Sequence, residues 1–197
     1  MNDSPRRVPM PAERYDQRWE TLAASGQDVH GEVGLVDALL GGPPARVLDA
    51  GCGTGRVAIE LDRRGYETVG VDVDPALLDR ARAKAPALAW QEADLASLPA
   101  DVAGGPFAAA VLAGNVMIFL ARGTEGAVLA NLAPRLAPGG LVVAGFQLSG
   151  RLPLAEYDAL ATAAGLTLRA RWSTWDRAPF TDADEYAVSV HELVSNR

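Results

Sequence analysis

Nine residues, VLDAGCGTG at Val47–Gly55, place an acidic side chain beside closely spaced glycines. A hydrophobic strand is expected to end near Asp49. Gly51 and Gly53 remove side chains where the following turn would touch a ligand or need a positive φ. The next helix offers unpaired N–H groups at its N-terminus, which attract an anion. A ligand that carries both an ammonium and a carboxylate group therefore suits this turn.

The spacing of these glycines argues against a dinucleotide. A G-x-G-x-x-G fingerprint counted from Gly51 would need its third glycine at Arg56, and counted from Gly53 it would need one at Ala58. The turn also lacks the Lys-Ser/Thr ending of a P-loop, and the carboxylate of Asp49 would repel a pyrophosphate. An NAD-dependent oxidoreductase on the same kind of sheet is therefore the weaker alternative.

Two more acidic residues follow later strands. Asp72 ends the segment VGVD, 21 positions after Gly51, where a carboxylate can accept hydrogen bonds from both hydroxyls of a ribose. Asp94 follows the next short strand, within EADLASLP at Glu92–Pro99. Each alone would also fit a solvated strand end or a loop cap. Together with Asp49 they fall at the carboxyl ends of three consecutive strands, where open α/β sheets bind ligands.

The elements that must position these residues alternate along the chain. Strands are expected at Arg46–Ala50, Thr68–Val71, Leu88–Gln91, Phe107–Leu112 and Gly140–Gln147. Helices between them imply parallel pairing through right-handed crossovers. Leu166–Trp175 and Glu185–Leu193 alternate in twos with no helix between them, so they should pair antiparallel. The prediction is an α/β fold with a doubly wound, mostly parallel, seven-stranded sheet and an antiparallel C-terminal hairpin.

Two segments with apolar residues at helical spacing precede this core, Ala12–Ala24 and Gly31–Leu40. The sequence GGPP at Gly41–Pro44 should end the second one. The 197 residues fit a single domain. We therefore expect residues 1–44 to form a helical cap within the same domain and residues 45–197 to form the core. The cap and the loop after Asn115 are the segments available to cover the site.

At these residues the chain resembles the class I S-adenosylmethionine-dependent methyltransferases, over the region from Arg46 to Leu193. The resemblance implies a Rossmann-like fold whose seventh strand lies between the fifth and the sixth, and S-adenosylmethionine as cofactor. The glycine turn looks like the first motif of that family. It implies contacts from Asp49, Gly51 and Gly53 to the methionine part of the cofactor. Cys52 belongs to the same turn, where it contacts the cofactor or simply fills space.

The resemblance extends to the adenosine part of the cofactor. It implies that Asp72 binds the ribose and that Val73 lies beside the adenine ring. By the same resemblance, Asp94 would accept a hydrogen bond from the adenine amino group, and the backbone N–H of Leu95 would meet a ring nitrogen.

The segment VLAGNVMIFL continues the resemblance at the fourth strand. Ala113 and Gly114 should end this strand beneath the sulfonium, with Asn115 facing the cleft. In the cap, Tyr15 and Trp19 lie one helical turn apart. They either present aromatic faces to the cationic cofactor or pack onto the domain.

The chain has two histidines. His30 lies between the two cap segments, where it is a candidate general base for an acceptor that must lose a proton. It would equally fit a helix start. His191 alternates within the last strand and is expected to be structural. No cluster of His, Cys, Asp and Glu has metal-ligand spacing, so we expect no metal site.

Composition narrows the acceptor class. The net charge is −7 and the basic residues are scattered, which disfavours a nucleic-acid partner. The longest nearly apolar run, Phe107–Leu120, is shorter than the roughly 20 residues that cross a bilayer, so no membrane partner is expected. A single cysteine and no apolar signal-like start favour the cytoplasm. The sequence thus predicts methyl transfer to an unidentified small molecule, with a non-catalytic S-adenosylmethionine-binding protein as the alternative.

Overall fold

A computed structural model describes residues 16–17, 21, 24–26, 29–148 and 150–194. The sheet has seven strands: β1 Arg46–Ala50, β2 Glu67–Asp72, β3 Ala89–Glu92, β4 Phe107–Leu112, β5 Leu136–Gln147, β6 Leu166–Trp172 and β7 Tyr186–Leu193. The helices are α2 Gly31–Leu40, α3 Arg56–Arg63, α4 Pro75–Lys84, α5 Val116–Phe119, α6 Glu125–Leu132 and α7 Leu154–Ala163. Short 3₁₀ helices occupy Leu95–Ser97 and Ala133–Arg135.

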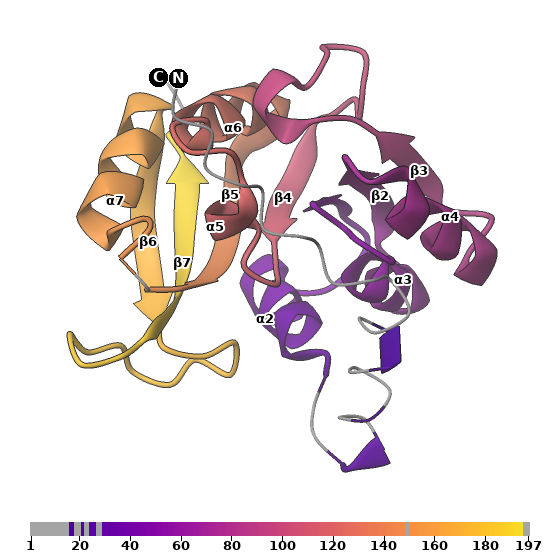
Figure 1. Cartoon of the computed structure of the whole chain (residues 1–197), viewed down its shortest axis with the longest axis horizontal. Coiled ribbons are helices and arrows are strands. Elements are labelled where there is room, and N and C mark those ends of the chain that lie inside the picture. Colours follow the sequence, from indigo (N-terminus) through magenta and orange to yellow (C-terminus); the bar gives the residue numbers. More distant parts are fainter. Residues whose placement is uncertain (1–15, 18–20, 22–23, 27–28, 149, 195–197) are drawn as a thin grey trace.

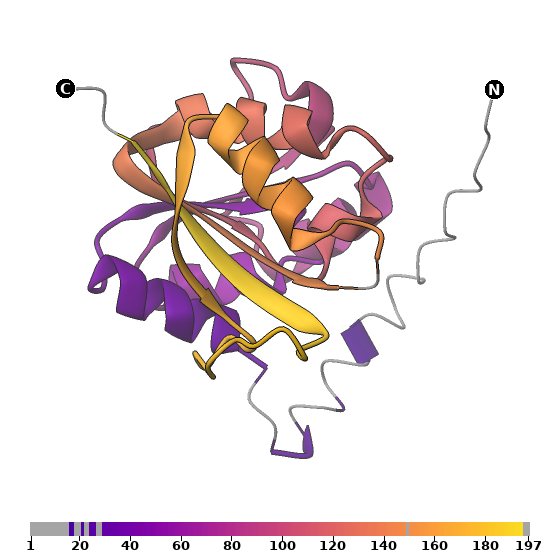
Figure 2. The same ribbon diagram turned by 90° about the vertical axis from the view of Figure 1, so that its left-hand side faces the viewer.

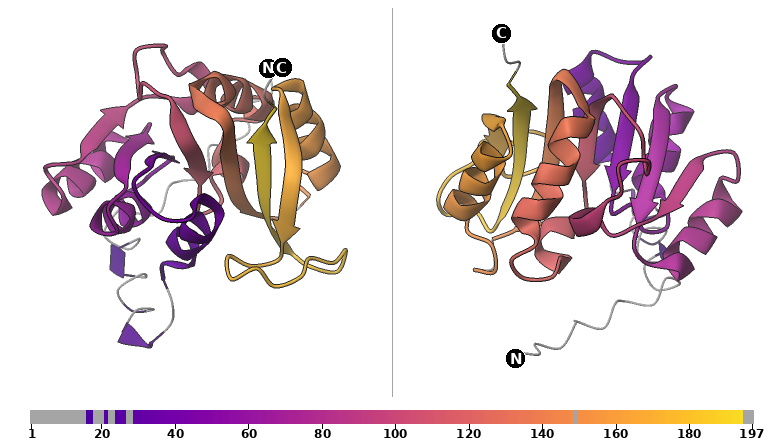
Figure 3. Two further views of the ribbon diagram at one scale, coloured as in Figure 1. Left: turned by 180° about the vertical axis from the view of Figure 1, so that it is seen from behind. Right: turned by 90° about the horizontal axis from the view of Figure 1, so that it is seen from above.

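The strand order is β3-β2-β1-β4-β5-β7-β6. All neighbours from β3 to β5 pair in parallel, while β7 pairs antiparallel with both β5 and β6. The predicted fold class and the position of β7 between β5 and β6 are therefore confirmed. Figure 1 shows this order across the sheet, and Figure 3 shows α4 beside β3 at one edge and α7 beside β6 at the other.

Helices cover both faces of the sheet (Figure 2). Buried side chains of α2 and α3 pack on one face and share a core with the inward residues of β1, β4, β5 and β7. Side chains of α6, α7 and the first 3₁₀ helix pack on the other face. We call the first the α2 face and the second the α7 face. Because alternate residues of a strand point to opposite faces, each strand-end residue belongs to one of them.

Two strand boundaries differ by three residues or more from those predicted, whereas the ends of β2, β3 and β7 differ by at most one residue. β5 begins at Leu136 rather than Gly140, because Phe107 pairs with Leu136 and the pairing resumes at Leu141 after a register shift. A Cβ at Gly140 would lie 2.8 Å from the carbonyl oxygen of Ala137, so only glycine fits this irregular stretch. β6 ends at Trp172, which leaves Trp175 in the loop before β7.

The first cap segment lies mostly outside the described residues, and Tyr15 and Trp19 are among those not described. Where it is described, Asp16, Gln17, Thr21 and Ala24 are helical, as predicted. The second segment forms α2, whose end is marked by Gly41 in a left-handed conformation. Among the described residues, no helix combines the length and apolar character that crossing a bilayer requires.

Candidate functional site

The glycine turn between β1 and α3 is fastened to the neighbouring strand. The backbone N–H groups of Gly51 and Cys52 both donate to the carbonyl of Val71, at 2.8 and 3.0 Å. Gly51, Gly53 and Gly55 have φ values of +80°, +55° and +84°. This left-handed backbone is costly for residues with a Cβ. The turn therefore depends on its glycines in the way the sequence predicts.

The three glycines meet different neighbours. A Cβ at Gly51 would lie 2.6 Å from Cγ2 of Val116, at the start of α5. A Cβ at Gly55 would lie 2.5 Å from the ring of Trp90, so Gly55 makes room for a side chain of β3 as well as for a helix packed close to its strand. A Cβ at Gly53 would meet nothing within 4 Å. The side of the turn above Gly53 is therefore open to a ligand.

Asp72 joins the end of β2 to this turn. Its Oδ2 accepts a hydrogen bond from the backbone N–H of Gly53 at 2.7 Å, and its Oδ1 accepts one from Asp74 at 2.9 Å. Burial raises the pKa of Asp72, and these backbone donors oppose the rise. A carboxylate has about four acceptor positions. Each oxygen of Asp72 already accepts a hydrogen bond from one backbone N–H, and each can therefore still accept a second one from a hydroxyl of a ribose.

Asp49 is buried beneath the turn. Its Oδ2 accepts a hydrogen bond from the backbone N–H of Ala58, in the first turn of α3, at 3.0 Å. It thus caps this helix, a task that the sequence analysis did not assign to it. Burial raises its pKa to about 7, while the N–H of Ala58 and the charge of Arg56 oppose the rise. A nearby cationic group would favour the ionised form of Asp49.

The rim beside β2 and β3 holds the residues predicted to meet the adenine. The carbonyl of Asp72 accepts from the N–H of Ala93 at 3.0 Å, which keeps the ends of the two strands together. Val73 is 59% exposed, unusually high for valine at a strand end. Asp94 caps the first 3₁₀ helix by accepting from Ala96 at 2.9 Å, and the side chain of Leu95 is buried below. Capping uses one oxygen of Asp94.

The end of β4 is tied to β5. Gly114 and Asn115 have φ values of +69° and +71°. The N–H of Asn115 donates to Gly145 at 3.3 Å, and its Oδ1 accepts from the N–H of Gln147 at 2.8 Å. The side chain of Asn115 therefore holds the loop after Ala113 against the next strand, in addition to any contact with the cleft.

Cys52 is buried in the glycine turn, with its Sγ 3.8 Å from the carbonyl oxygen of Gly53. Burial raises the pKa of its thiol, and the charges of Asp49 and Asp72 raise it further. A thiol held protonated is a poor nucleophile. Its surroundings agree with the space-filling interpretation.

The two histidines occupy different surroundings. His30 precedes α2, and its carbonyl accepts from Val33 at 2.9 Å. It lines a cavity of about 170 Å³ together with Asp16, Arg56 and Lys84. That cavity does not include the end of β4, so the catalytic role of His30 stays a prediction. His191 is buried, with Nε2 3.2 Å from Asp158, and burial lowers its pKa.

The sequence analysis did not predict two side-chain contacts near the carboxyl ends of the parallel strands. Glu32 and Arg56 form a bidentate ion pair, and their side chains are only 7% and 10% exposed. This ion pair joins α2 to α3. Trp175 donates from Nε1 to Oη of Tyr186 at 3.2 Å, and the indole ring and this hydroxyl lie close against Gly145 of β5. An isolated glycine inside an apolar strand signals such a close approach. Gly145 offered that signal.

Comparisons with known proteins identify the family to which this chain belongs. Residues 47–140 match the family described as a methyltransferase domain. The crystal structure of a TehB-like S-adenosylmethionine-dependent methyltransferase from Corynebacterium glutamicum is 37% identical, with a TM-score of 0.83. The alignment covers 91% of this chain and 96% of that one. This chain belongs to the S-adenosylmethionine-dependent methyltransferases. Its cofactor is accordingly S-adenosylmethionine, as the sequence predicts.

Curated relatives agree on the family and differ in what their names say they methylate. The magnesium-protoporphyrin O-methyltransferase of Rhodobacter capsulatus is 34% identical over 119 residues, covering 52% of this chain and 50% of that protein. The trans-aconitate 2-methyltransferase of Methylobacterium nodulans is 31% identical over 157 residues, covering 64% and 58%. The chain thus spans only about half to three-fifths of the length of these two relatives.

The residues at this edge suit the cofactor of the family. The open side of Gly53 leaves room for a contact between the ligand and the backbone. The remaining acceptor positions of Asp72 suit the hydroxyls of a ribose, and the exposed side chain of Val73 suits an adenine ring. Within the described parts of the chain, no group of three or more His, Cys, Asp or Glu residues is arranged to hold a metal ion.

Proposed function

We propose that this chain transfers a methyl group from S-adenosylmethionine to a small molecule, which lies on the α2 face of the sheet beside the end of β4. The observation that carries the proposal is the Trp175–Tyr186 pair on Gly145. Gly145 pairs with Val188 and lies next to Ala113 and the loop that follows β4. In this proposal the two side chains form an aromatic wall on one side of the acceptor, which favours a compact molecule.

The cofactor residues in this proposal are those predicted from the sequence. Asp49, Gly51, Cys52 and Gly53 would surround the methionine part. Four further residues, Asp72, Val73, Asp94 and Leu95, would hold the adenosine. Ala113, Gly114 and Asn115 would lie under the sulfonium, and Tyr15 of the cap, residues 1–44, would cover it. The main support is that described members of this set converge on the carboxyl edge of the strands.

When bound, the cofactor supplies a methyl group on a sulfonium that already carries its leaving group. The chain therefore needs mainly to orient an acceptor and exclude water, and good orientation alone is worth roughly 7–11 kcal/mol. Tyr186 fits a positioning role. Burial raises its pKa to about 12, so its phenol stays protonated and can donate a hydrogen bond to the acceptor.

Proton removal is a separate question. An acceptor that must lose a proton requires a base, and in this proposal His30 would be that base. It precedes α2 and lines one cavity with Arg56 and Asp16, which supports access from that side of the glycine turn. An acceptor that is already deprotonated would need no base.

The acceptor class is supported by charge and by the names of relatives. The net charge of −7 disfavours a nucleic-acid backbone. The two curated relatives above are named for a porphyrin and for a carboxylic acid. The single cysteine suits a reducing compartment, so we place the reaction in the cytoplasm.

The test is transfer of labelled methyl from S-adenosylmethionine into a fractionated metabolite extract. Wild type should label at least one low-molecular-weight compound, and Asp72→Ala should label none. Trp175→Ala should retain S-adenosylhomocysteine binding within about twofold, because it lies outside the cofactor residues, and it should change which compounds are labelled. Binding without any transfer would favour the non-catalytic alternative instead. Label found only in protein or nucleic acid would overturn the small-molecule assignment.

A further inference from the structure

Phe119, the last residue of α5, carries an exposed aromatic ring near the edge that binds the cofactor. Four large apolar side chains are exposed in the part of the chain that the structure describes: Val73, Phe119, Leu168 and Val194. Leu168 and Val194 belong to the end of the sheet that β4 and β5 separate from β1. Val73 is predicted to meet the adenine ring. Phe119 is 60% exposed, and no role in cofactor binding accounts for it.

Single exposed apolar residues are common on protein surfaces, so the neighbours of Phe119 decide what its exposure means. α5 packs against the glycine turn through its first residue, since a Cβ at Gly51 would lie 2.6 Å from Cγ2 of Val116. Residues three apart lie on the same side of a helix, so Phe119 follows Val116 one turn further along. Met117 between them is fully buried in the core of the α7 face. Phe119 therefore extends the side of α5 that meets the turn predicted to hold the methionine part.

Both ends of α5 are fastened to neighbouring segments. At its start, the backbone N–H of Asn115 donates to the carbonyl of Gly145 in β5 at 3.3 Å. At its end, the guanidinium group of Arg151 donates to the carbonyl of Leu120 and also binds Glu125 of α6 at 3.3 Å. A side chain on a helix held in this way is already in position before a ligand arrives, and such preorganisation lowers the entropic cost of binding.

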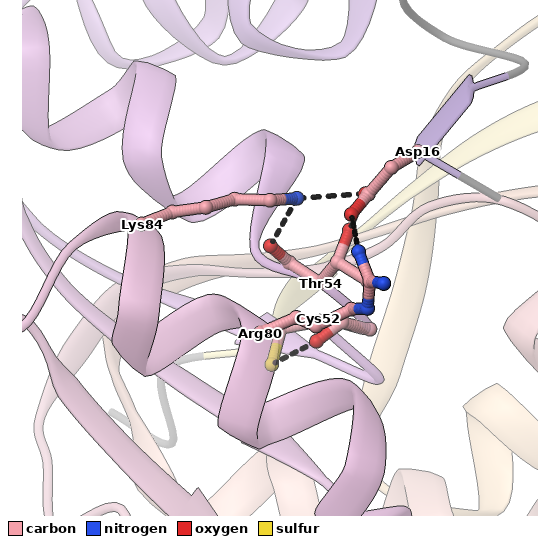
Figure 4. A network of polar contacts seen from close by, with 6 residues as sticks. Asp16, Cys52, Thr54, Arg80 and Lys84 are labelled. Atoms are coloured by element: carbon pink, nitrogen blue, oxygen red, sulfur yellow. Dashed lines mark hydrogen bonds and ion pairs between the residues drawn. The ribbon is translucent and has the colours of Figure 1, made fainter. Parts of the chain in front are cut away.

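The glycine turn on which Val116 rests is held as well. Thr54 donates from Oγ1 to Asp16 at 2.6 Å, and its carbonyl accepts from Nζ of Lys84 in α4 at 3.2 Å (Figure 4). Lys84 also binds Asp16, at 2.7 Å. α4 and α5 thus contact the same turn. The fold therefore fixes where Phe119 lies relative to a cofactor bound at this turn.

A second aromatic surface lies against the same part of β5. The indole of Trp175 and the hydroxyl of Tyr186 lie close to Gly145, the residue whose carbonyl accepts from Asn115. Trp175 packs with the core of the α2 face, whereas residues of α5 pack with the core of the α7 face. The two aromatic surfaces therefore belong to opposite faces of the sheet and meet at its edge. Aromatic rings gain from stacked or edge-to-face contact, which suits a flat ring placed between them.

We infer that Phe119 contacts the methyl acceptor and that this acceptor is a planar aromatic molecule. The inference rests on the proposed methyl transfer to a small molecule, and it adds the chemical class of that molecule. Phe119 offers the acceptor a flat apolar surface and takes no part in moving a proton. A saturated ring of the same size would lose the stacking contact and bind more weakly.

The first experiment measures how naphthol, a planar molecule, and decalol, its saturated counterpart, bind to the full chain in complex with S-adenosylhomocysteine. Wild type should bind naphthol more tightly than decalol. Phe119→Leu keeps an apolar side chain but loses the flat ring, so it should bind naphthol about threefold to tenfold more weakly, and Phe119→Trp should restore the affinity. Leu168→Ala removes an exposed apolar side chain on β6 and should behave as wild type. The affinity for S-adenosylhomocysteine should be the same in all of these proteins.

The second experiment follows labelled methyl from S-adenosylmethionine into a fractionated metabolite extract. The labelled compounds should absorb in the near ultraviolet, as aromatic rings do. Phe119→Leu should label them more slowly than wild type, whereas Phe119→Trp and Leu168→Ala should label them at the rate of wild type.

Equal naphthol affinity in Phe119→Leu and wild type, or labelled compounds without aromatic absorbance, would overturn the inference while the proposed methyl transfer stands. An equal loss of affinity for S-adenosylhomocysteine and for naphthol in Phe119→Leu would assign Phe119 to the cofactor and overturn it too. If wild type transfers no methyl group to any small molecule, the proposed function fails, and the inference that depends on it fails with it.

Discussion

The Oδ2 atom of Asp72 accepts a hydrogen bond from the backbone N–H of Gly53 at 2.7 Å, so the residue predicted to hold the ribose also anchors the turn predicted to hold the methionine part. Removing this carboxylate should affect both halves of the cofactor. We expect Asp72→Ala to weaken S-adenosylhomocysteine binding by about 10- to 100-fold, since hydrogen bonds to charged groups contribute roughly 1.5–3 kcal/mol. Calorimetry on the purified variant measures this.

Asp74→Ala is the matched control for this prediction. The side chain of Asp74 caps α4 by accepting from Ala76 at 2.9 Å, while its backbone N–H, which donates to Asp72, would remain. Loss of such a cap costs about 1 kcal/mol of stability, and affinity should stay within about twofold. Equal affinities for Asp72→Ala and wild type would remove Asp72 from the site.

Gly53 and Gly51 should respond differently to alanine. Both need a positive φ, which costs an alanine about 1–2 kcal/mol. A Cβ at Gly53 enters open space, whereas a Cβ at Gly51 also collides with Val116. Gly53→Ala should therefore fold with a small loss in the free energy of unfolding yet bind S-adenosylhomocysteine at least about tenfold more weakly, because its methyl group takes the space of the ligand. Gly51→Ala should lose more of the free energy of unfolding than Gly53→Ala, as measured by urea denaturation.

Gly123→Ala controls for backbone strain alone. Gly123 has a φ of +82°, and a Cβ there meets nothing within 4 Å. Its position before α6 is remote from the glycine turn in the sequence. It should lose a similar amount of stability to Gly53→Ala and keep wild-type affinity. If Gly53→Ala also kept wild-type affinity, the open side of the turn would not be where the ligand lies.

Asp49 should make cofactor binding depend on pH. Burial raises its pKa to about 7, so part of the population carries a proton at neutral pH. The ammonium group of S-adenosylhomocysteine favours the ionised form, which means that binding releases a proton. Affinity should therefore rise as the pH increases from 6 to 8, by up to about tenfold per pH unit below the pKa. Titrations at pH 6.5 in buffers of different ionisation enthalpy would count the released proton.

Asp49→Asn tests the origin of this pH dependence. The asparagine can still accept from the N–H of Ala58, so α3 keeps its cap. Because the folded-state pKa of Asp49 is raised, its contribution to stability is complete below its unfolded value and is lost as the pH rises through about 7. Asp49→Asn should thus be relatively more stable than wild type at pH 8 than at pH 5, and should release no proton on binding. An unchanged proton release would assign it to another group.

The sequence predicted the framework of the site because local signals agreed with the global fold. Three acids near the carboxyl ends of three apolar strands predicted a parallel sheet with one ligand-binding edge, and two alternating segments without a helix between them predicted an antiparallel hairpin; the structure contains this sheet and this hairpin. The roles of the individual cofactor residues remain predictions, because the fold places them at one edge without showing their ligand.

Contacts between distant residues were out of reach of the sequence. Trp90 fills the space above both Gly55 and Gly70, yet nothing near Trp90 in the chain indicates this. The pair of Glu32 and Arg56 joins residues 24 positions apart, and Asp16 lies 38 positions before Thr54. Neither contact has a periodicity or a local motif. Such contacts follow from how α2, α3 and Asp16 are brought together, which depends on the whole fold.

The aromatic wall beside β4 provides the last prediction. A Cβ at Gly145 would overlap the ring of Trp175 and lie 2.6 Å from Oη of Tyr186. Gly145→Ala should therefore lower the free energy of unfolding by about 1–3 kcal/mol through overpacking. In the Trp175→Ala background the same substitution should cost less, because the indole is no longer there. A double-mutant cycle in urea measures this coupling.

Leu168→Ala is the comparison for that cycle, because Leu168 is 42% exposed on β6 and should be additive with Gly145→Ala. Additivity of Gly145→Ala with Trp175→Ala as well would mean that the indole does not lie against β5, and the acceptor would then lose its proposed wall. If instead Gly145→Ala and Trp175→Ala are coupled, and Trp175→Ala binds S-adenosylhomocysteine with unchanged affinity, the site has two separate halves. The strand-end acids and the glycine turn then serve the cofactor, and the β6–β7 loop serves the acceptor.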